Sequence, residues 1–74
     1  MPVNWRNYIV STPEILPGKP LIKATRIPVR LILGYFAAGW TTDEIIVAFP
    51  DLKTTQIYAC LDYARDLAEF EEVT

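Results

Sequence analysis

The sequence predicts a mainly α-helical chain, a three-helix helix-turn-helix preceded by a short β arm or hairpin. The segment from Gly39 to Leu61 has the order glycine, capped short helix, tight break and capped longer helix with an apolar stripe, which is typical of a helix-turn-helix. The stretch from Gly18 to Val29 is basic and β-prone, and it contains a proline suited to the start of a helix. These two segments together indicate a regulator or binding module.

The length of 74 residues indicates one small domain. We divide it into the β arm at 1–27, the three-helix segment at 28–70 and an acidic tail at 71–74. The composition is 51% hydrophobic, which is rich for a chain with little interior, so we expect part of the apolar surface to close a homodimer interface. No run approaches the roughly eighteen apolar residues of a membrane span, so no membrane partner is expected.

The chain contains no histidine and a single cysteine, Cys60. This composition excludes a Ser-His or Cys-His catalytic pair and any zinc site with a histidine ligand. Asp62 and Asp66 share a helix face, but two carboxylates without histidine are a weak metal signal. We therefore expect no enzyme, no catalytic residue, no metal and no cofactor. A lone cysteine cannot form an internal disulfide, which favours a cytoplasmic location.

The net charge of −2 hides a strong asymmetry along the chain. Residues 1–37 contain five cations and one acid, a balance of +4, whereas residues 38–74 contain two cations and eight acids, a balance of −6. One hypothesis is that the first half meets an anion and the second a cationic surface. The other, equally weighted, is that the two halves neutralise each other within the monomer or across a dimer.

Two short strand candidates, Ile9–Val10 and 21–23, are separated by the turn signals Ser11-Thr12-Pro13 and Pro17-Gly18. They could form a hairpin, but an isolated hairpin is marginal in water. We therefore expect them to need a third strand, a helix or the arm of a second chain.

The first helix is expected to start at Pro28, to run from Val29 to Ala38 and to end at Gly39, a suitable left-handed cap. Its apolar residues lie nearly all round, which predicts a helix buried on most sides and favours a dimer. For Arg26 we favour a structural role, tying down backbone carbonyls or a carboxylate. The predicted dimer interface consists of Leu21, Ile22, Arg26, Leu31 and Tyr35.

Thr41 and Glu44 are spaced as a capping box for a second helix of about 42–49. Thr54 is the predicted cap of the third helix, which runs to about Phe70. Its inward stripe is predicted as Ile57, Cys60, Leu61, Ala64, Leu67 and Ala68. Its outward face is predicted as Gln56, Tyr58, Ala59, Asp62, Tyr63, Asp66 and Glu69.

The first turns of the third helix are the candidate base readers, because that end of a recognition helix enters the major groove. The lysines of the arm are candidate phosphate contacts, since Lys19 and Lys23 share strand parity. The complete set of predicted DNA-binding residues is Lys19, Lys23, Arg30, Lys53, Thr54, Thr55, Gln56 and Tyr58. For Thr54 a plain helix cap is the favoured alternative, and for Gln56 and Tyr58 solvent or partner packing is at least as plausible.

The acidic face and tail of the third helix are a candidate docking surface for a protein partner. In this interpretation Phe70 fills a pocket and the carboxylates meet basic or metal-binding residues; the simpler alternative is a solvated helix end. The predicted partner-binding residues are Asp62, Tyr63, Asp66, Glu69, Phe70, Glu71 and Glu72.

Four motifs carry a family resemblance: GKPLIKATRIPV at 18–29, AGWT at 38–41, EI at 44–45 and FPDL at 49–52. On these motifs the chain resembles the domain of unknown function 433 family over roughly residues 5 to 65. The resemblance implies a homeodomain-like helix-turn-helix fold and a VapB-type antitoxin that binds a PIN-like ribonuclease toxin and its own operator DNA. The family motif has glycine where this chain has Ala24, so a positive φ there would cost about 1 kcal/mol.

Two alternatives to an antitoxin remain open at this stage. The chain could be a DNA-binding regulator without a toxin, which would bind its own upstream region with a steep dependence on salt. It could also be a dimeric protein-interaction module that never contacts DNA, a hypothesis that the acidic pI of about 4.9 favours.

Overall fold

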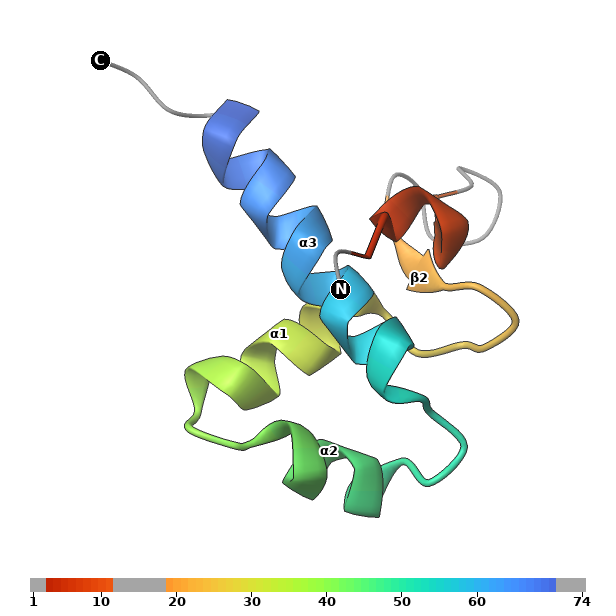
Figure 1. The fold of residues 1–74 in the computed structure, drawn as a ribbon, viewed down its shortest axis with the longest axis vertical. Coiled ribbons are helices and arrows are strands. Elements are labelled where there is room, and N and C mark those ends of the chain that lie inside the picture. The colour runs from red at the N-terminus through yellow and green to blue at the C-terminus, as the bar shows by residue number, and fades with distance from the viewer. Residues whose placement is uncertain (1–2, 12–18, 71–74) are drawn as a thin grey trace.

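A computed structural model describes residues 3–11 and 19–70 of the chain, except the side chains of 69 and 70. The chain has three α-helices and a small antiparallel hairpin, which confirms the predicted fold class. Figure 1 shows how these elements are arranged. In chain order the elements are a 3-10 helix η1 (Trp5–Asn7), β1 (Ile9–Val10), β2 (Leu21–Ile22), α1 (Val29–Ala37), α2 (Thr42–Ala48) and α3 (Thr54–Phe70).

The hairpin pairs β1 with β2, and Ile9 lies opposite Ile22. The second edge of β2 is used by the segment that leads into α1. There the Ile22 N–H donates to the Ile27 carbonyl at 2.9 Å, and the Val29 N–H donates to the Pro20 carbonyl at 3.1 Å. The hairpin therefore finds the additional support it needs within its own chain.

The turn after β2 places Ala24 in the left-handed region, with φ of 66°. Three hydrogen bonds hold it: the Thr25 N–H and hydroxyl both donate to the Ile22 carbonyl, at 3.1 and 2.7 Å, and the Ile27 N–H donates to the Thr25 hydroxyl at 3.0 Å. Ala24 is therefore the strained alanine that the comparison with the family motif predicted, and glycine would be about 1 kcal/mol more favourable there.

The end of α1 is closed by Gly39, whose φ is 98°. The Gly39 N–H donates to the Phe36 carbonyl and the Trp40 N–H to the Tyr35 carbonyl, both at 3.0 Å. This pair of bonds is a Schellman motif, and the Trp40 and Tyr35 rings pack 4.4 Å apart above it. The predicted glycine cap is confirmed.

The starts of α1 and α2 differ in how closely they follow the predictions. The capping box of α2 is confirmed, since the Thr41 N–H donates to Glu44 Oε1 at 2.7 Å and the Glu44 N–H to Thr41 Oγ1 at 3.2 Å. Pro28 was predicted as the first helical residue, but it has extended backbone and occupies the N-cap position of α1. Its ring therefore ends the strand-like segment, and the helix starts one residue later.

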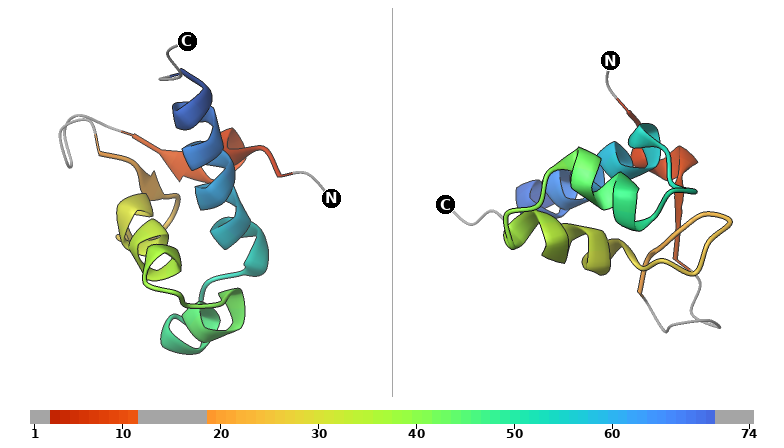
Figure 2. Two further views of the ribbon diagram at one scale, coloured as in Figure 1. Left: turned by 90° about the vertical axis from the view of Figure 1, so that its left-hand side faces the viewer. Right: turned by 90° about the horizontal axis from the view of Figure 1, so that it is seen from below.

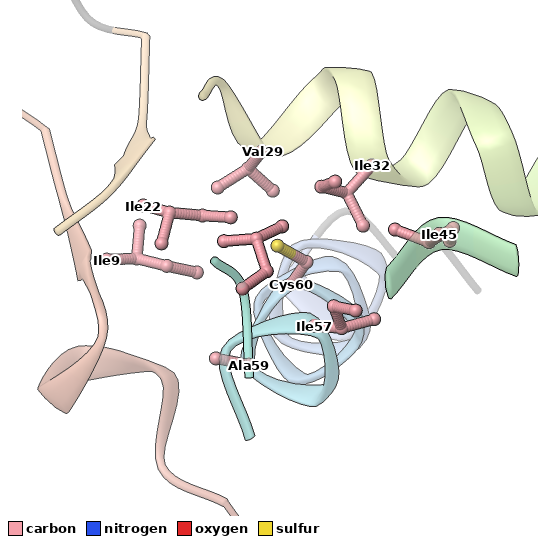
Figure 3. Packing of buried hydrophobic residues seen from close by; sticks show 9 residues of the cluster. Ile9, Ile22, Val29, Ile32, Ile45, Ile57, Ala59 and Cys60 are labelled. Atoms are coloured by element: carbon pink, nitrogen blue, oxygen red, sulfur yellow. The ribbon is translucent and has the colours of Figure 1, made fainter. Parts of the chain in front are cut away.

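The core lies where the hairpin, α1 and α2 meet the first half of α3 (Figure 3). Its fully buried larger side chains are Ile22, Val29, Ile32, Ile45, Ile57 and Cys60. The prediction that α1 is buried on most sides is wrong for the monomer: only Val29 and Ile32 are buried, and Leu31 is 36% exposed. One chain covers one face of α1, because α2 and α3 both pack from the same side.

The predicted faces of α3 need correction. Ala59 was assigned outward and is fully buried, whereas Leu61 and Leu67 were assigned inward and are 39% and 43% exposed. The physical reason is that α3 extends beyond the core, as Figures 1 and 2 show, and that η1 packs on a second side of the helix.

Candidate nucleic-acid and partner surfaces

The start of α3 is held by a side chain that was predicted to read bases. The Lys53 N–H, just before the helix, donates to Gln56 Oε1 at 2.7 Å. Thr54 is the first helical residue, so the prediction that it caps the helix is wrong. Gln56 is occupied by this local contact, whereas Lys53, Thr55 and Tyr58 present exposed side chains.

Five cationic side chains are exposed and available to an anion: Lys19, Lys23, Arg26, Arg30 and Lys53. Within the described residues, the side chains of these five make no ion pair and no hydrogen bond. Within the described residues Arg26 ties down neither a carbonyl nor a carboxylate, and the bonds of its turn come from Thr25 instead. Arg26 joins the exposed cations.

The turn of the arm lies beside the turn of the helix-turn-helix. A hollow of about 400 Å³ is lined by residues 24–27 on one side and 48–52 on the other, and both connections run along the same edge in Figures 1 and 2. Arg26 thus lies close to the segment that leads into Lys53. Asp51 lines the same hollow and partly offsets the positive charge there.

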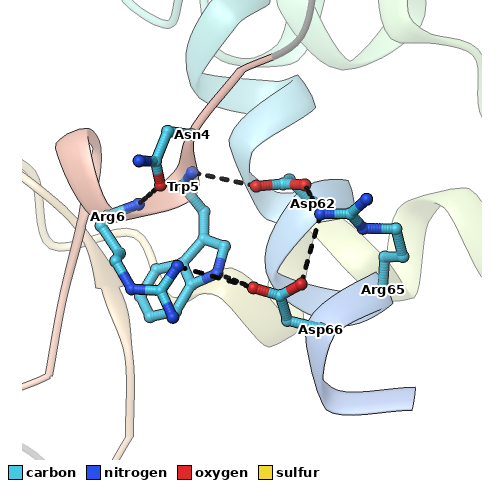
Figure 4. Close-up of polar contacts among 6 residues, drawn as sticks. All are labelled: Asn4, Trp5, Arg6, Asp62, Arg65 and Asp66. Atoms are coloured by element: carbon cyan, nitrogen blue, oxygen red, sulfur yellow. Dashed lines mark hydrogen bonds and ion pairs between the residues drawn. The ribbon is translucent and has the colours of Figure 1, made fainter. Parts of the chain in front are cut away.

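The N-terminal segment is fastened to the charged face of α3 by Trp5 (Figure 4). The Trp5 backbone N–H donates to Asp62 Oδ2 at 3.0 Å, and its indole N–H donates to Asp66 Oδ2 at 2.6 Å. The Trp5 ring meets Tyr63 edge-on at 4.9 Å. The guanidinium of Arg6 lies 4.5 Å from the Trp5 ring centroid and 3.7 Å from Asp66.

These contacts change the predicted partner surface. Asp62, Tyr63 and Asp66 were assigned to a protein partner, but they hold Trp5, and Arg65 pairs with both carboxylates at 2.7 and 3.2 Å. Their side chains therefore already have partners within the chain, and their contact with a protein partner stays a prediction. The other predicted partner residues, Glu69, Phe70, Glu71 and Glu72, have side chains outside the described part of the chain.

The predicted dimer interface is only partly available. Leu21 and Ile22 are buried within the monomer, at 6% and 0% exposure, and Ile22 belongs to the core, so neither side chain is exposed to a second chain in this conformation. Tyr35 is half-buried and packs on Trp40. Leu31 and Arg26 remain exposed.

The structure offers little chemistry beyond these surfaces. Burial raises the pKa of the Cys60 thiol to about 12, so the thiol stays protonated and inert at neutral pH. Within the described part of the chain, no three His, Cys, Asp or Glu side chains gather as a metal ion would require. No helix found there is long and apolar enough to cross a membrane.

The chain is similar to a known protein family over the hairpin, α1, α2 and most of α3. Residues 9–64 match the family described as protein of unknown function (DUF433). The uncharacterized protein y4eO of Sinorhizobium fredii (strain NBRC 101917 / NGR234) is 34% identical over 60 residues, 81% of this chain and 27% of that protein. The chain therefore spans about a quarter of the length of this relative. No solved structure matches.

Proposed function

The chain belongs to the DUF433 family, and we propose that it is the DNA-binding, antitoxin-like partner in a bacterial toxin–antitoxin pair. The observation that best supports DNA binding is the group of exposed cations on the arm, the first turn of α1 and the start of α3. In this proposal Lys53, Thr55 and Tyr58 approach the major groove, while Lys23 and Arg26 follow the adjacent phosphates.

The contact with DNA is confined to the first turns of α3. Asp62 and Asp66 lie one and two turns beyond Tyr58, and their negative charge disfavours any closer approach of the sugar-phosphate backbone. A short contact of this kind neutralises few phosphates. We therefore expect modest affinity with a salt dependence set by up to about five cations.

The test is titration of the chain with DNA from its own upstream region at several salt concentrations, followed by fluorescence anisotropy. Lys53→Ala is expected to weaken binding and to reduce the slope of log K against log salt by about 0.9. The matched control is Arg65→Ala, which removes a cation from the far half of the same helix and should leave the slope unchanged. No binding at low salt would refute the DNA-binding proposal.

A second surface supports the binding of a toxin. Trp40, Glu44, Val47 and Ala48 line an open groove of about 290 Å³ on the outer side of α2, and Val47 is 81% exposed. An exposed apolar patch beside the Glu44 carboxylate suits a partner with apolar and basic groups. We propose that a ribonuclease toxin, the partner that the family resemblance implies, docks on this groove.

Co-expression with the product of the adjacent gene tests the toxin proposal. Val47→Gln should abolish the complex and the relief of toxicity, whereas Leu67→Gln, a similar change on α3, should preserve both. A complex with DNA but none with the neighbouring product would favour a regulator without a toxin. The reverse result would favour an interaction module that does not bind DNA.

A further inference from the structure

A hollow of about 660 Å³ lies between the N-terminal segment and the exposed side of α3. Val3, Tyr58 and Leu61 supply its apolar lining, and the other residues that line it are polar or charged. Tyr58 is the only one of them that the proposed DNA contact uses, and the other α3 residues of the lining lie farther along the helix. Exposed apolar side chains beside charged ones, with tyrosine and arginine among them, have the composition of a protein-binding surface.

The charged lining of this hollow consists of two arginines and two aspartates that differ in exposure. Arg65 pairs with Asp62 and with Oδ1 of Asp66, at 2.7 and 3.2 Å, and Arg6 lies 3.7 Å from Oδ2 of Asp66 (Figure 4). The two aspartate side chains are 19% and 31% exposed, whereas Arg6 and Arg65 are 66% and 63% exposed. The four charges cancel at a distance, but a partner in contact with the hollow meets mainly the guanidinium groups.

Both guanidinium groups keep hydrogen-bond donors for a ligand. Within the described part of the chain, the hydrogen bonds of Arg65 both come from Nη2, and Arg6 contacts Asp66 only through Nη1. The remaining nitrogens prefer carboxylate oxygens, with which they form charge-assisted hydrogen bonds. Arg6 also lies over the Trp5 ring, 4.5 Å from its centroid. The two groups are therefore held in place before a ligand binds, which lowers the entropic cost of binding.

We propose that this hollow binds an acidic segment of a protein partner, with an aliphatic side chain of the segment against Leu61 and its carboxylates on Arg6 and Arg65. Charge complementarity with the two exposed guanidinium groups selects this occupant. The segment is opposite in charge to the partner proposed for the groove on α2. The hollow is therefore a docking surface additional to the proposed function.

Other occupants fit the hollow less well. A basic segment, which the sequence predicted for this face, would meet the exposed guanidinium groups and would have to displace Trp5 or Arg65 from the carboxylates. An uncharged apolar segment would cover the guanidinium donors without pairing them, which costs free energy. The phosphate backbone of DNA supplies acceptors but no aliphatic group for Leu61.

Selection from a random peptide library displayed on phage tests the chemistry of the occupant. The full chain is the target, and counter-selection on Leu61→Gln removes peptides that bind elsewhere. Leu61 lies outside the core, and circular dichroism checks that the variant folds. The surviving peptides should share acidic residues around an aliphatic one. No surviving peptide, or a consensus that is basic or uncharged, would overturn the proposal.

Fluorescence anisotropy with the enriched peptide, made synthetically, tests the role of the arginines. Arg65→Gln should raise the dissociation constant about fivefold or more. The matched control is Arg30→Gln, which removes an exposed cation from α1 and should leave the constant unchanged. Equal losses in the two variants would show a general attraction to positive charge and overturn the proposal. So would duplex DNA that displaces the peptide and is weakened equally by Arg65→Gln. The peptide measurements need neither operator DNA nor a toxin, so the docking surface and the proposed function can fail independently.

Discussion

The two halves of α3 are stabilised in opposite ways. The first half buries Ile57, Ala59 and Cys60 under the hairpin, α1 and α2, and its polar start remains in solvent. The second half offers Asp62 and Asp66 to Trp5 and leaves its leucines exposed. The comparison shows that the core of one chain ends about halfway along a helix of 17 residues, so the remaining apolar stripe is available for association.

The largest expected effect is a difference in the free energy of unfolding between variants in the first and the second half of α3. Ile57→Ala should lower the free energy of unfolding by about 2–5 kcal/mol, because it leaves a cavity in the only apolar core that the described residues form. Leu67→Ala removes a similar side chain from the open half and should change the monomer by less than about 0.5 kcal/mol. Urea unfolding at low protein concentration checks both values. Similar losses in the two variants would contradict a core confined to the first half.

The next effect tests the polar cover of the second half. Trp5→Ala should cost about 2 kcal/mol, since it removes the packing on Tyr63 and leaves the partly buried Asp66 carboxylate without its indole donor. Tyr58→Ala, which removes an exposed aromatic from α3, is the control. Amide hydrogen exchange should become faster in residues 5–10 of the Trp5 variant. Unchanged protection would show that the N-terminal segment is held by other contacts.

A smaller effect, an increase in the free energy of unfolding, is expected from a substitution in the turn after β2. Ala24→Gly relieves the positive φ in the turn after β2 and should stabilise the chain by about 1 kcal/mol. Ala38→Gly, at a position with ordinary helical backbone, should instead destabilise it. Melting temperatures that shift in opposite directions would support the strained turn, and a loss of stability in both would contradict it.

The smallest effect concerns the start of α3. Gln56→Ala removes the acceptor of the Lys53 N–H and should cost about 0.5 kcal/mol, with faster exchange of the Lys53 amide. Thr55→Ala leaves that bond intact and serves as the control. A large loss of DNA affinity in the Gln56 variant, without any change in Lys53 exchange, would restore the direct base contact that the sequence predicted.

The sequence predicted correctly the features that depend on neighbouring residues. The box between Thr41 and Glu44 and the cap at Gly39 follow from short patterns with one geometric solution. The hairpin was predicted only as a possibility, and its register, with Ile9 opposite Ile22, comes from the structure. The faces of α3 were predicted less well, because periodicity states where apolar side chains lie on a helix but not how far its neighbours extend. Leu61 and Leu67 obey the period and still lack a cover.

The contacts of Trp5 could not be predicted from the sequence. Its two carboxylate acceptors lie 57 and 61 residues away along the chain, and no local pattern links them. The same limitation explains why Asp62 and Asp66 were assigned to a partner. The sequence does not distinguish a helix carboxylate that faces solvent from one that accepts a hydrogen bond from an indole. The structural role predicted for Arg26 is not seen within the described residues, since Thr25 already supplies the bonds of that turn.

The buried thiol of Cys60 is a natural probe for opening of the core. While the core is closed, the raised pKa and the lack of access prevent alkylation. When the core opens, the thiol regains an ordinary pKa and reacts. The chain has a single cysteine, so one labelling rate measures how often the first half of α3 separates from the hairpin, without a dye or an engineered site. The same measurement in a cell extract would report whether DNA, a protein partner or a second copy slows that opening.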